Sequence, residues 1–174
     1  IVLQRIEIIF IIKMTLKENN CSPFSVYETA VGAVDSEIKL FIPADTSGTA
    51  GVFSDHSAKH DYNSVTVPIM KFDNLIRHVM LPGRILVKVD IEGSEYNFII
   101  GAEEFFIKHK PVMIIEINPY SFAAAKISGI ELKALVEKLG YKYFSEISNP
   151  IRLISLDQLK FDYLRNIVLF PEQF

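Results

Sequence analysis

Residues 85–120 read ILVKVDIEGSEYNFIIGAEEFFIKHKPVMIIEINPY, and this stretch decides the fold that we expect. Two apolar, β-branched runs, residues 85–89 and 112–117, flank a segment with helical periodicity. This order predicts a β-α-β unit with parallel strands. Open parallel sheets bind ligands at the carboxyl ends of their strands, so acidic residues at those ends indicate a site. The acidic residues there are Asp90, Glu92 and Glu116.

Length and composition restrict the class of protein. The chain has 174 residues and is 49% hydrophobic, so we expect one domain over residues 1–174 with a sizeable core. Its 18 basic and 21 acidic residues give a net charge of −3, which does not favour a nucleic-acid partner. The single cysteine, Cys21, excludes an internal disulfide framework and indicates a reducing compartment, so we expect a cytoplasmic location.

The first residues, IVLQRIEIIFIIK, are apolar but do not predict a membrane anchor. Arg5 and Glu7 interrupt the run, which is shorter than the ~20 residues that span a bilayer. A signal peptide would begin with basic residues and end at a small-residue cleavage site, and neither is present. We expect a buried strand over residues 1–7 and a helix over residues 8–19.

The remaining elements follow from periodicity, caps and turn residues. Pro68 predicts that the strand around it lies at a sheet edge, and Asp73 predicts the start of a short helix. The expected strands are residues 25–34 and 37–42, forming an antiparallel hairpin, then 64–70, 141–147 and 166–170. The expected helices are residues 73–80, one from Ser94 to Pro111, and one from the Ser128–Glu131 capping box to Gly140. We expect loops at residues 118–120 and 148–165, with a helical turn near 156–159.

The segment Lys88-Val89-Asp90-Ile91-Glu92-Gly93-Ser94-Glu95 resembles the FkbM-type methyltransferases. The resemblance covers most of residues 19–170. Further matches at the family's spacing are Ala30-Val31-Gly32, Phe72-Asp73, Gly101-Ala102, Lys110-Pro111 and Leu139-Gly140-Tyr141.

This resemblance implies a Rossmann-like class I methyltransferase sheet, mostly parallel with an antiparallel last strand. It implies S-adenosylmethionine as the cofactor and methyl transfer to a hydroxyl of a sugar or small metabolite. By spacing, Glu7 falls where the family's ribose-binding carboxylate lies, although the proline that usually follows is Ile8 here. The resemblance also assigns Ala30, Val31 and Asp90 to cofactor binding.

One departure concerns the first strand of the family's fold and the glycine-rich turn that follows it. The first glycine here is Gly32, so we expect a domain that is incomplete at its N-terminus and is inactive if that turn is essential. The lacking strand would lie beside residues 87–90 and leave two unpaired edges. The N-terminal run, a partner or a longer natural protein could fill that place, and we favour the last.

Each candidate site residue has a functional and a structural interpretation. We expect Asp90 to position a substrate hydroxyl or the cofactor's cation, with a turn cap as the alternative. Glu92 is assigned to catalysis, with a favourable helix-dipole interaction as the alternative. Glu116 is a candidate general base, and Asn118 a candidate for holding the acceptor, although Asn-Pro is equally a turn signal. Glu95 is expected to be structural.

Other functions remain open as alternatives. The three carboxylates have the ligand chemistry of a divalent metal site, but such clusters are common without metal, so we expect none. His56 and His60 lie four residues apart in a polar segment, which favours exposed histidines over a metal site. The rivals to an O-methyltransferase are a degenerate, non-catalytic scaffold and a metal-dependent hydrolase or transferase.

Overall fold

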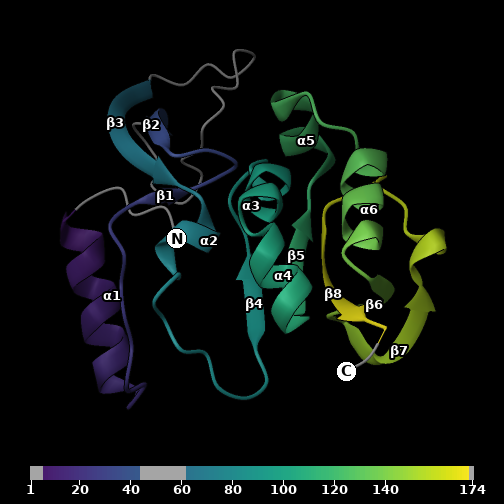
Figure 1. The fold of residues 1–174 in the computed structure, drawn as a ribbon. Helices are drawn as coiled ribbons and strands as arrows, with labels where there is room; N and C mark the ends of the chain where they lie inside the picture. The colour runs from purple at the N-terminus through teal and green to yellow at the C-terminus, as the bar shows by residue number, and fades with distance from the viewer. Residues whose placement is uncertain (1–5, 44–61, 173–174) are drawn as a thin grey trace.

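A computed structural model describes residues 6–43 and 62–172, which form two sheets that lie side by side (Figure 1). The three-stranded sheet has the order β1-β3-β2. Strand β3 is parallel to β1 and antiparallel to β2. The strands are β1 (Ala30–Val31), β2 (Ser36–Pro43) and β3 (Tyr62–Met70).

The five-stranded sheet has the order β4-β5-β8-β6-β7. Its strands are β4 (Leu86–Val89), β5 (Val112–Ile117), β6 (Tyr141–Glu146), β7 (Asn149–Ser155) and β8 (Arg165–Pro171). Only β4 and β5 are parallel, and the other three neighbouring pairs are antiparallel. The expected antiparallel last strand is confirmed, but a mostly parallel sheet is wrong for the described residues, because both sheets are mixed.

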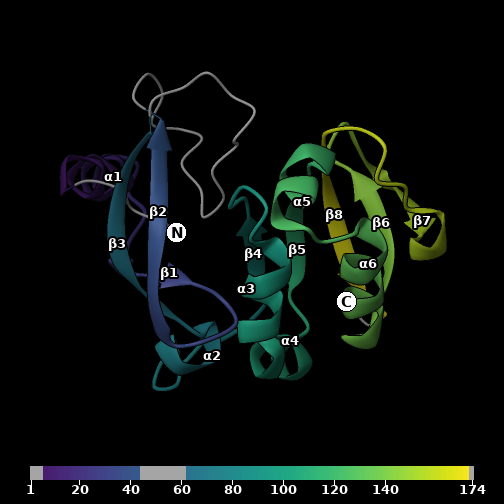
Figure 2. The ribbon, with the colours of Figure 1, turned by 90° about the horizontal axis from the view of Figure 1, so that it is seen from above.

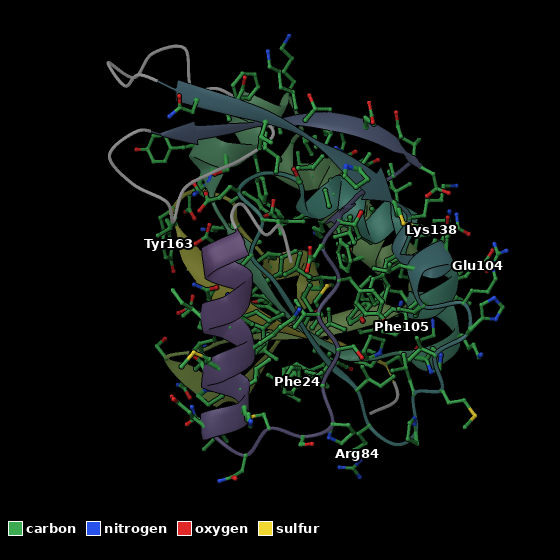
Figure 3. All side chains as sticks on the ribbon, turned by 90° about the vertical axis from the view of Figure 1, so that its left-hand side faces the viewer. Phe24, Arg84, Glu104, Phe105, Lys138 and Tyr163 are labelled. Atoms are coloured by element: carbon green, nitrogen blue, oxygen red, sulfur yellow. The ribbon has the colours of Figure 1, made fainter. Side chains whose placement is uncertain are left out.

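Four helices cover one face of the five-stranded sheet (Figures 1 and 2). They are α3 (Glu95–Gly101), α4 (Glu103–His109), α5 (Pro119–Ala125) and α6 (Gly129–Lys138). Helix α1 (Ile6–Glu18) lies on the outside of the molecule, away from this sheet (Figure 3). The short helix α2 (Phe72–Leu75) joins the sheets, and a 3-10 turn, η1 (Leu156–Gln158), precedes β8. No helix of the described residues has the length and apolar character needed to cross a bilayer.

The core lies between the five-stranded sheet and its helices. The strands contribute Met113, Ile115 and Ile167, and the helices contribute Ile99 and Phe106, all of which are fully buried. Burying one such side chain stabilises the fold by about 1.5–3 kcal/mol, so this layer sets the position of β4 and β5.

The N-terminal strand prediction is wrong where it is described, because Ile6 and Glu7 belong to helix α1. A short run of β-branched residues fits a buried strand and a helix equally well, and here the helix formers that follow extend it as one helix. Residues 1–5 lie outside the described structure.

The predicted hairpin has the wrong partner. Strand β2 pairs with β3, and β1 keeps only two residues of the expected strand. Pro68 therefore lies in the central strand, opposite Glu37, and not at an edge. Proline has no N–H to donate to a neighbouring strand, and it is tolerated here because β1 pairs only with Ile69 and Met70. The Pro68 carbonyl accepts a hydrogen bond from the Thr29 hydroxyl at 3.0 Å.

Three further elements differ from expectation. Helix α5 (Pro119–Ala125) begins within the loop that we expected at residues 118–120, and β7 forms where we expected irregular chain. Nearly all side chains of strand β7 are exposed, and the apolar residues Ile151, Leu153 and Ile154 do not alternate regularly with polar ones, so its residues carry no clear strand signal. The helix expected from Ser94 is interrupted at Ala102 and forms α3 and α4.

Several local signals are confirmed. Ser128 and Glu131 form the reciprocal capping box of α6, and Gly140 follows its end with a φ of +89°. Ser94 is the N-cap of α3, although its hydroxyl makes no capping hydrogen bond. Helix α4 ends at His109, two residues before Pro111.

Strands β1 and β4 are terminal in their sheets, and an apolar groove of about 200 Å³ lies beside both. We call this the inter-sheet groove. Its walls come from residues before and in β1, from α2, from β4 and from α3. They include Tyr27, Val31, Phe72, Val87, Val89 and Phe98.

Candidate active site

The parallel ladder of β4 and β5 brings two acidic residues to one edge of the sheet. Val89 is paired with Ile115, so Asp90 and Glu116 come next on adjacent strands. Glu92 joins them from the turn after β4, and one carboxylate oxygen of each residue lies within 4.8 Å of the others. The sequence predicted this shared edge correctly. We call Asp90, Glu92 and Glu116 the carboxylate rim.

A tight turn presents Glu92 to the rim. Glu92 and Gly93 both have positive φ values, +50° and +93°. A Cβ at position 93 would lie 2.7 Å from the Ser121 carbonyl oxygen, so only glycine fits this approach to α5. The Ser121 hydroxyl donates to Glu92 Oε2 at 3.4 Å and fixes the carboxylate.

Asn118 has a structural role beside the rim. Its Oδ1 accepts from the backbone N–H groups of Tyr120 and Ser121, at 3.2 and 3.3 Å, and caps α5. Its Nδ2 donates to Glu116 Oε2 at 3.4 Å. Asn118 therefore orients Glu116, while its predicted contact with a substrate stays a prediction.

The rim is strongly negative. Burial raises the pKa of Glu92, and the neighbouring Glu116 and Asp90 raise it further, while the hydrogen bond from Ser121 lowers it. Lys88 forms an ion pair with Asp90 on its exposed side. Glu92 therefore holds a proton more readily than an ordinary glutamate does.

Glu95 is the site residue that sequence reasoning placed in a purely structural role. Its side chain is only 1% exposed, and Oε1 accepts from the Ile91 N–H at 3.2 Å. Burial is the main cause that raises the pKa of Glu95 to about 7. The burial of Glu95 could have been predicted from helical spacing, because Glu95 lies on the same helix face as the apolar residues Phe98, Ile99 and Ala102, and all four are buried.

The predicted cofactor residues are not all brought together. Val31 and Val89 both line the inter-sheet groove, and Ala30 is buried next to Val31 in β1. Glu7 lies in the first turn of α1 and not at a strand end. Its contact with the cofactor's ribose remains a prediction. His56 and His60 fall outside the described residues. Cys21 is exposed and free.

Comparison with known proteins shows a family and a similar fold. The model of the methyltransferase FkbM domain matches residues 5–143. The crystal structure of methyltransferase FkbM from Methylobacillus flagellatus KT is similar in fold, with a TM-score of 0.53 and 14% sequence identity. The match covers 97% of this chain but 35% of that chain. No curated protein matches this chain.

The domain has an α/β fold similar to that of an FkbM methyltransferase. The chain belongs to the methyltransferase FkbM domain family. The FkbM resemblance of the motif at residues 88–95 is thus confirmed.

Proposed function

We propose that this domain transfers a methyl group from S-adenosylmethionine to a hydroxyl of a sugar or small metabolite. The observation that supports this most is the carboxylate rim, where Asp90 and Glu116 end adjacent parallel strands within the matched family domain. Methyl transfer to oxygen needs the acceptor proton removed, and a rim of carboxylates offers that base.

In this proposal each residue of the carboxylate rim has a different role in methyl transfer. The methyl donor, when bound, would supply a methyl group on a positively charged sulfur, and a carboxylate of the rim would take the proton of the acceptor hydroxyl. Glu92 suits this role because its raised pKa brings it closer to neutral pH. Glu116, oriented by Asn118, holds the acceptor hydroxyl. Asp90, at the end of β4, faces the positive charge of the bound methyl donor.

The inter-sheet groove suits an apolar part of the cofactor. Its lining is largely apolar. Val89 and Ile91, the residues before and after Asp90 in the sequence, both line the groove. Its volume of about 200 Å³ is below the ~300–1,000 Å³ of typical ligand pockets. Ala30 and Val31 would therefore contact one portion of the cofactor, and other groups would cover the rest.

Binding of S-adenosylmethionine and S-adenosylhomocysteine tests this proposal by calorimetry, because the two ligands differ by a methyl group and a positive charge. We expect tighter binding of S-adenosylmethionine, and we expect Asp90→Asn to reduce this preference roughly tenfold by removing a Coulomb attraction of about 1–1.5 kcal/mol. Asp157→Asn, an exposed change on η1, is the control and should leave the preference unchanged. An unchanged preference in Asp90→Asn would contradict the role of Asp90.

The scaffold alternative is tested in the same way. The calorimetric titration with both ligands is repeated on a second form of the protein, which includes any residues that its gene encodes before Ile1. Binding of either ligand, followed by transfer of radiolabelled methyl groups to a panel of sugars and hydroxylated metabolites, supports the enzyme. Absence of binding to both forms of the protein supports a non-catalytic scaffold.

A further inference from the structure

A positively charged hollow lies where β4 and β5 begin, at the opposite end of these strands from the carboxylate rim. Its walls come from the loop that joins α2 to β4 and from the end of α4 (Figure 1). Residues 77–82 and the pair Lys108 and His109 line a cavity of about 510 Å³ there. We call this the basic groove.

The parallel pairing of β4 and β5 brings the two walls together. Residues 77–82 lead into β4, and Lys108 and His109 lead into β5. The two strands begin side by side, where the Val112 N–H donates to the Ile85 carbonyl at 3.1 Å. The basic groove is therefore positioned by the same pair of strands that positions the rim.

The lining of the basic groove carries positive charge without a compensating acid. It contains the cations Arg77 and Lys108 and the imidazoles of His78 and His109, and no acidic residue is among the described residues that line it. None of these four side chains takes part in an ion pair within the described ranges. The whole chain has a net charge of −3, so the groove is opposite in sign to the protein as a whole. Such a patch attracts anionic groups.

Two of these side chains are held in place by their neighbours. Arg77 donates to Asn74 Oδ1 at 2.7 Å, and Asn74 donates in turn to the Asp35 carboxylate at 2.5 Å. The His109 ring lies against the Phe105 ring, with centres 5.3 Å apart. Arginine has several N–H donors, so the guanidinium keeps donors for a carboxylate. Groups that are already ordered lose less entropy when a ligand binds.

The rest of the groove is apolar. Residues 79–82 are valine, methionine, leucine and proline. The Met80 side chain is 91% exposed and that of Val79 is 41% exposed. Methionine is flexible and polarizable, and it is common on surfaces that bind peptides. The ligand that fits both parts of the groove is therefore anionic and also carries an apolar group.

The groove continues into a second hollow of about 480 Å³, with which it shares Arg77, Lys108 and His109. Two acidic residues of that hollow are already engaged, because Asp73 accepts from two N–H groups at the start of α4 and Glu103 pairs with Lys138. The two hollows together suit an extended chain better than a compact anion.

We propose that the basic groove binds an acidic segment of another protein that carries a bulky apolar side chain. Carboxylates of the segment pair with Arg77 and Lys108, and its apolar side chain lies on Met80. The concave shape favours a chain segment over the flat surface of a membrane, and the volume is within the ~300–1,000 Å³ of typical ligand sites. This binding is independent of methyl transfer, because it takes place away from the rim.

A structural interpretation of the same residues exists and predicts a different result. Lys108 and His109 lie in the last turn of α4, where positive charge interacts favourably with the helix dipole. That role alone changes the stability of α4 and gives the protein no affinity for an acidic peptide.

Nuclear magnetic resonance of isotope-labelled protein tests the proposal, with the synthetic peptide acetyl-DEELFDEE-amide as the probe. Titration to about 1 mM peptide detects even weak binding and locates it. We expect shifts of the amide signals of residues 77–81, Lys108 and His109, and of the Met80 methyl group. The peptide acetyl-DEESSDEE-amide keeps the charge without the apolar side chains and should bind at least threefold more weakly.

Variants of the groove give the matched comparison. We expect Arg77→Ala, Lys108→Ala and Met80→Ser each to weaken peptide binding at least threefold, and the double variant Arg77→Ala/Lys108→Ala at least tenfold. Lys160→Ala removes the same charge from an exposed position before β8 and should bind as the parent does. The amide spectrum of each variant also establishes that it is folded.

Three outcomes would overturn the proposal. The first is the absence of shifts in the groove, and the second is equal binding by the parent and the double variant. The third is sedimentation of the parent, but not of the double variant, with phosphatidylserine vesicles while the peptide causes no shifts, which would assign the groove to a membrane surface. The titrations contain no methyl donor, so their result is separate from the test of methyl transfer.

Discussion

At the scale of single residues, Glu95 makes folding sensitive to pH. Its pKa is raised from 4.5 to about 7, mainly by burial, so the folded protein favours the neutral acid. Below pH 4.5 the acid is neutral in both the folded and unfolded states, and burial of the carboxyl group costs least. As the pH rises towards 7 and above, the unfolded state ionises freely and this relative stability is lost.

Glu95→Gln keeps the shape and removes the ionisation. We expect the free energy of unfolding of the variant to rise relative to the parent from pH 4.5 to 7, and then to level at a gain of roughly 2–3 kcal/mol. Urea unfolding between pH 4 and 8.5, in the presence of a chelator, measures it. Glu104→Gln is the control, because Glu104 points to solvent while its neighbour Phe105 points inward (Figure 3). Parallel pH profiles for all three proteins would contradict the role of Glu95.

At the scale of elements, Asp73 caps a helix that is far away in sequence. The sequence predicts Asp73 as the cap of the helix beginning there, but that helix, α2, has only four residues and no side-chain cap. The carboxylate instead accepts from the N–H groups of Glu104 and Phe105, at 3.0 and 2.9 Å, at the start of α4. A cap between elements stabilises both the helix and its packing.

Asp73→Ala removes both hydrogen bonds. We expect it to lower the free energy of unfolding by about 1–2 kcal/mol, and Asp73→Asn by less, because its amide oxygen still accepts. Urea denaturation at neutral pH measures both. Asp157→Ala on η1 has an exposed carboxylate and should stay within about 0.5 kcal/mol of the parent. An Asp73→Ala variant as stable as this control would show that the cap contributes nothing.

Elements with a local signal could be predicted from sequence, and elements set by distant partners could not. The 3.6-residue stripe and capping box fix α6, and the apolar runs around Asp90 and Glu116 fix β4 and β5. The pairing of β2 with β3 and the position of Pro68 in the central strand depend on the order of the strands in the sheet, which local sequence does not determine. The same holds for the site, since the rim follows from strand ends whereas the unpaired oxygen of Glu95 depends on tertiary burial.

At the scale of the whole molecule, α2 connects the two sheets. Phe72 packs edge-on against Phe98 and Phe105, with ring centres 5.5 and 5.1 Å apart. The Asp35 carboxylate, in the turn before β2, accepts from the Lys71 N–H at 2.6 Å and from Asn74 at 2.5 Å. The inter-sheet groove lies beside this connection, and the prediction that a further strand lies next to β4 remains to be tested there.

Gly101 tests how closely the sheets are held together. It ends α3, and a Cβ at this position would lie 1.9 Å from the carbonyl oxygen of Gly32, in the turn after β1. Helix propensity alone predicts that Gly101→Ala stabilises the protein by about 0.5–1 kcal/mol. The clash with backbone of the other sheet predicts a loss of roughly 1–3 kcal/mol instead.

The two effects have opposite signs, so the sign of the change in unfolding free energy decides between them. We expect a loss, measured by urea denaturation. Gly83→Ala separates packing from backbone strain, because its φ is +80° but no atom lies within 4 Å of the added Cβ, so it should cost only about 1 kcal/mol. A Gly101→Ala variant more stable than the parent would mean that the turn after β1 and the end of α3 are not in contact in solution.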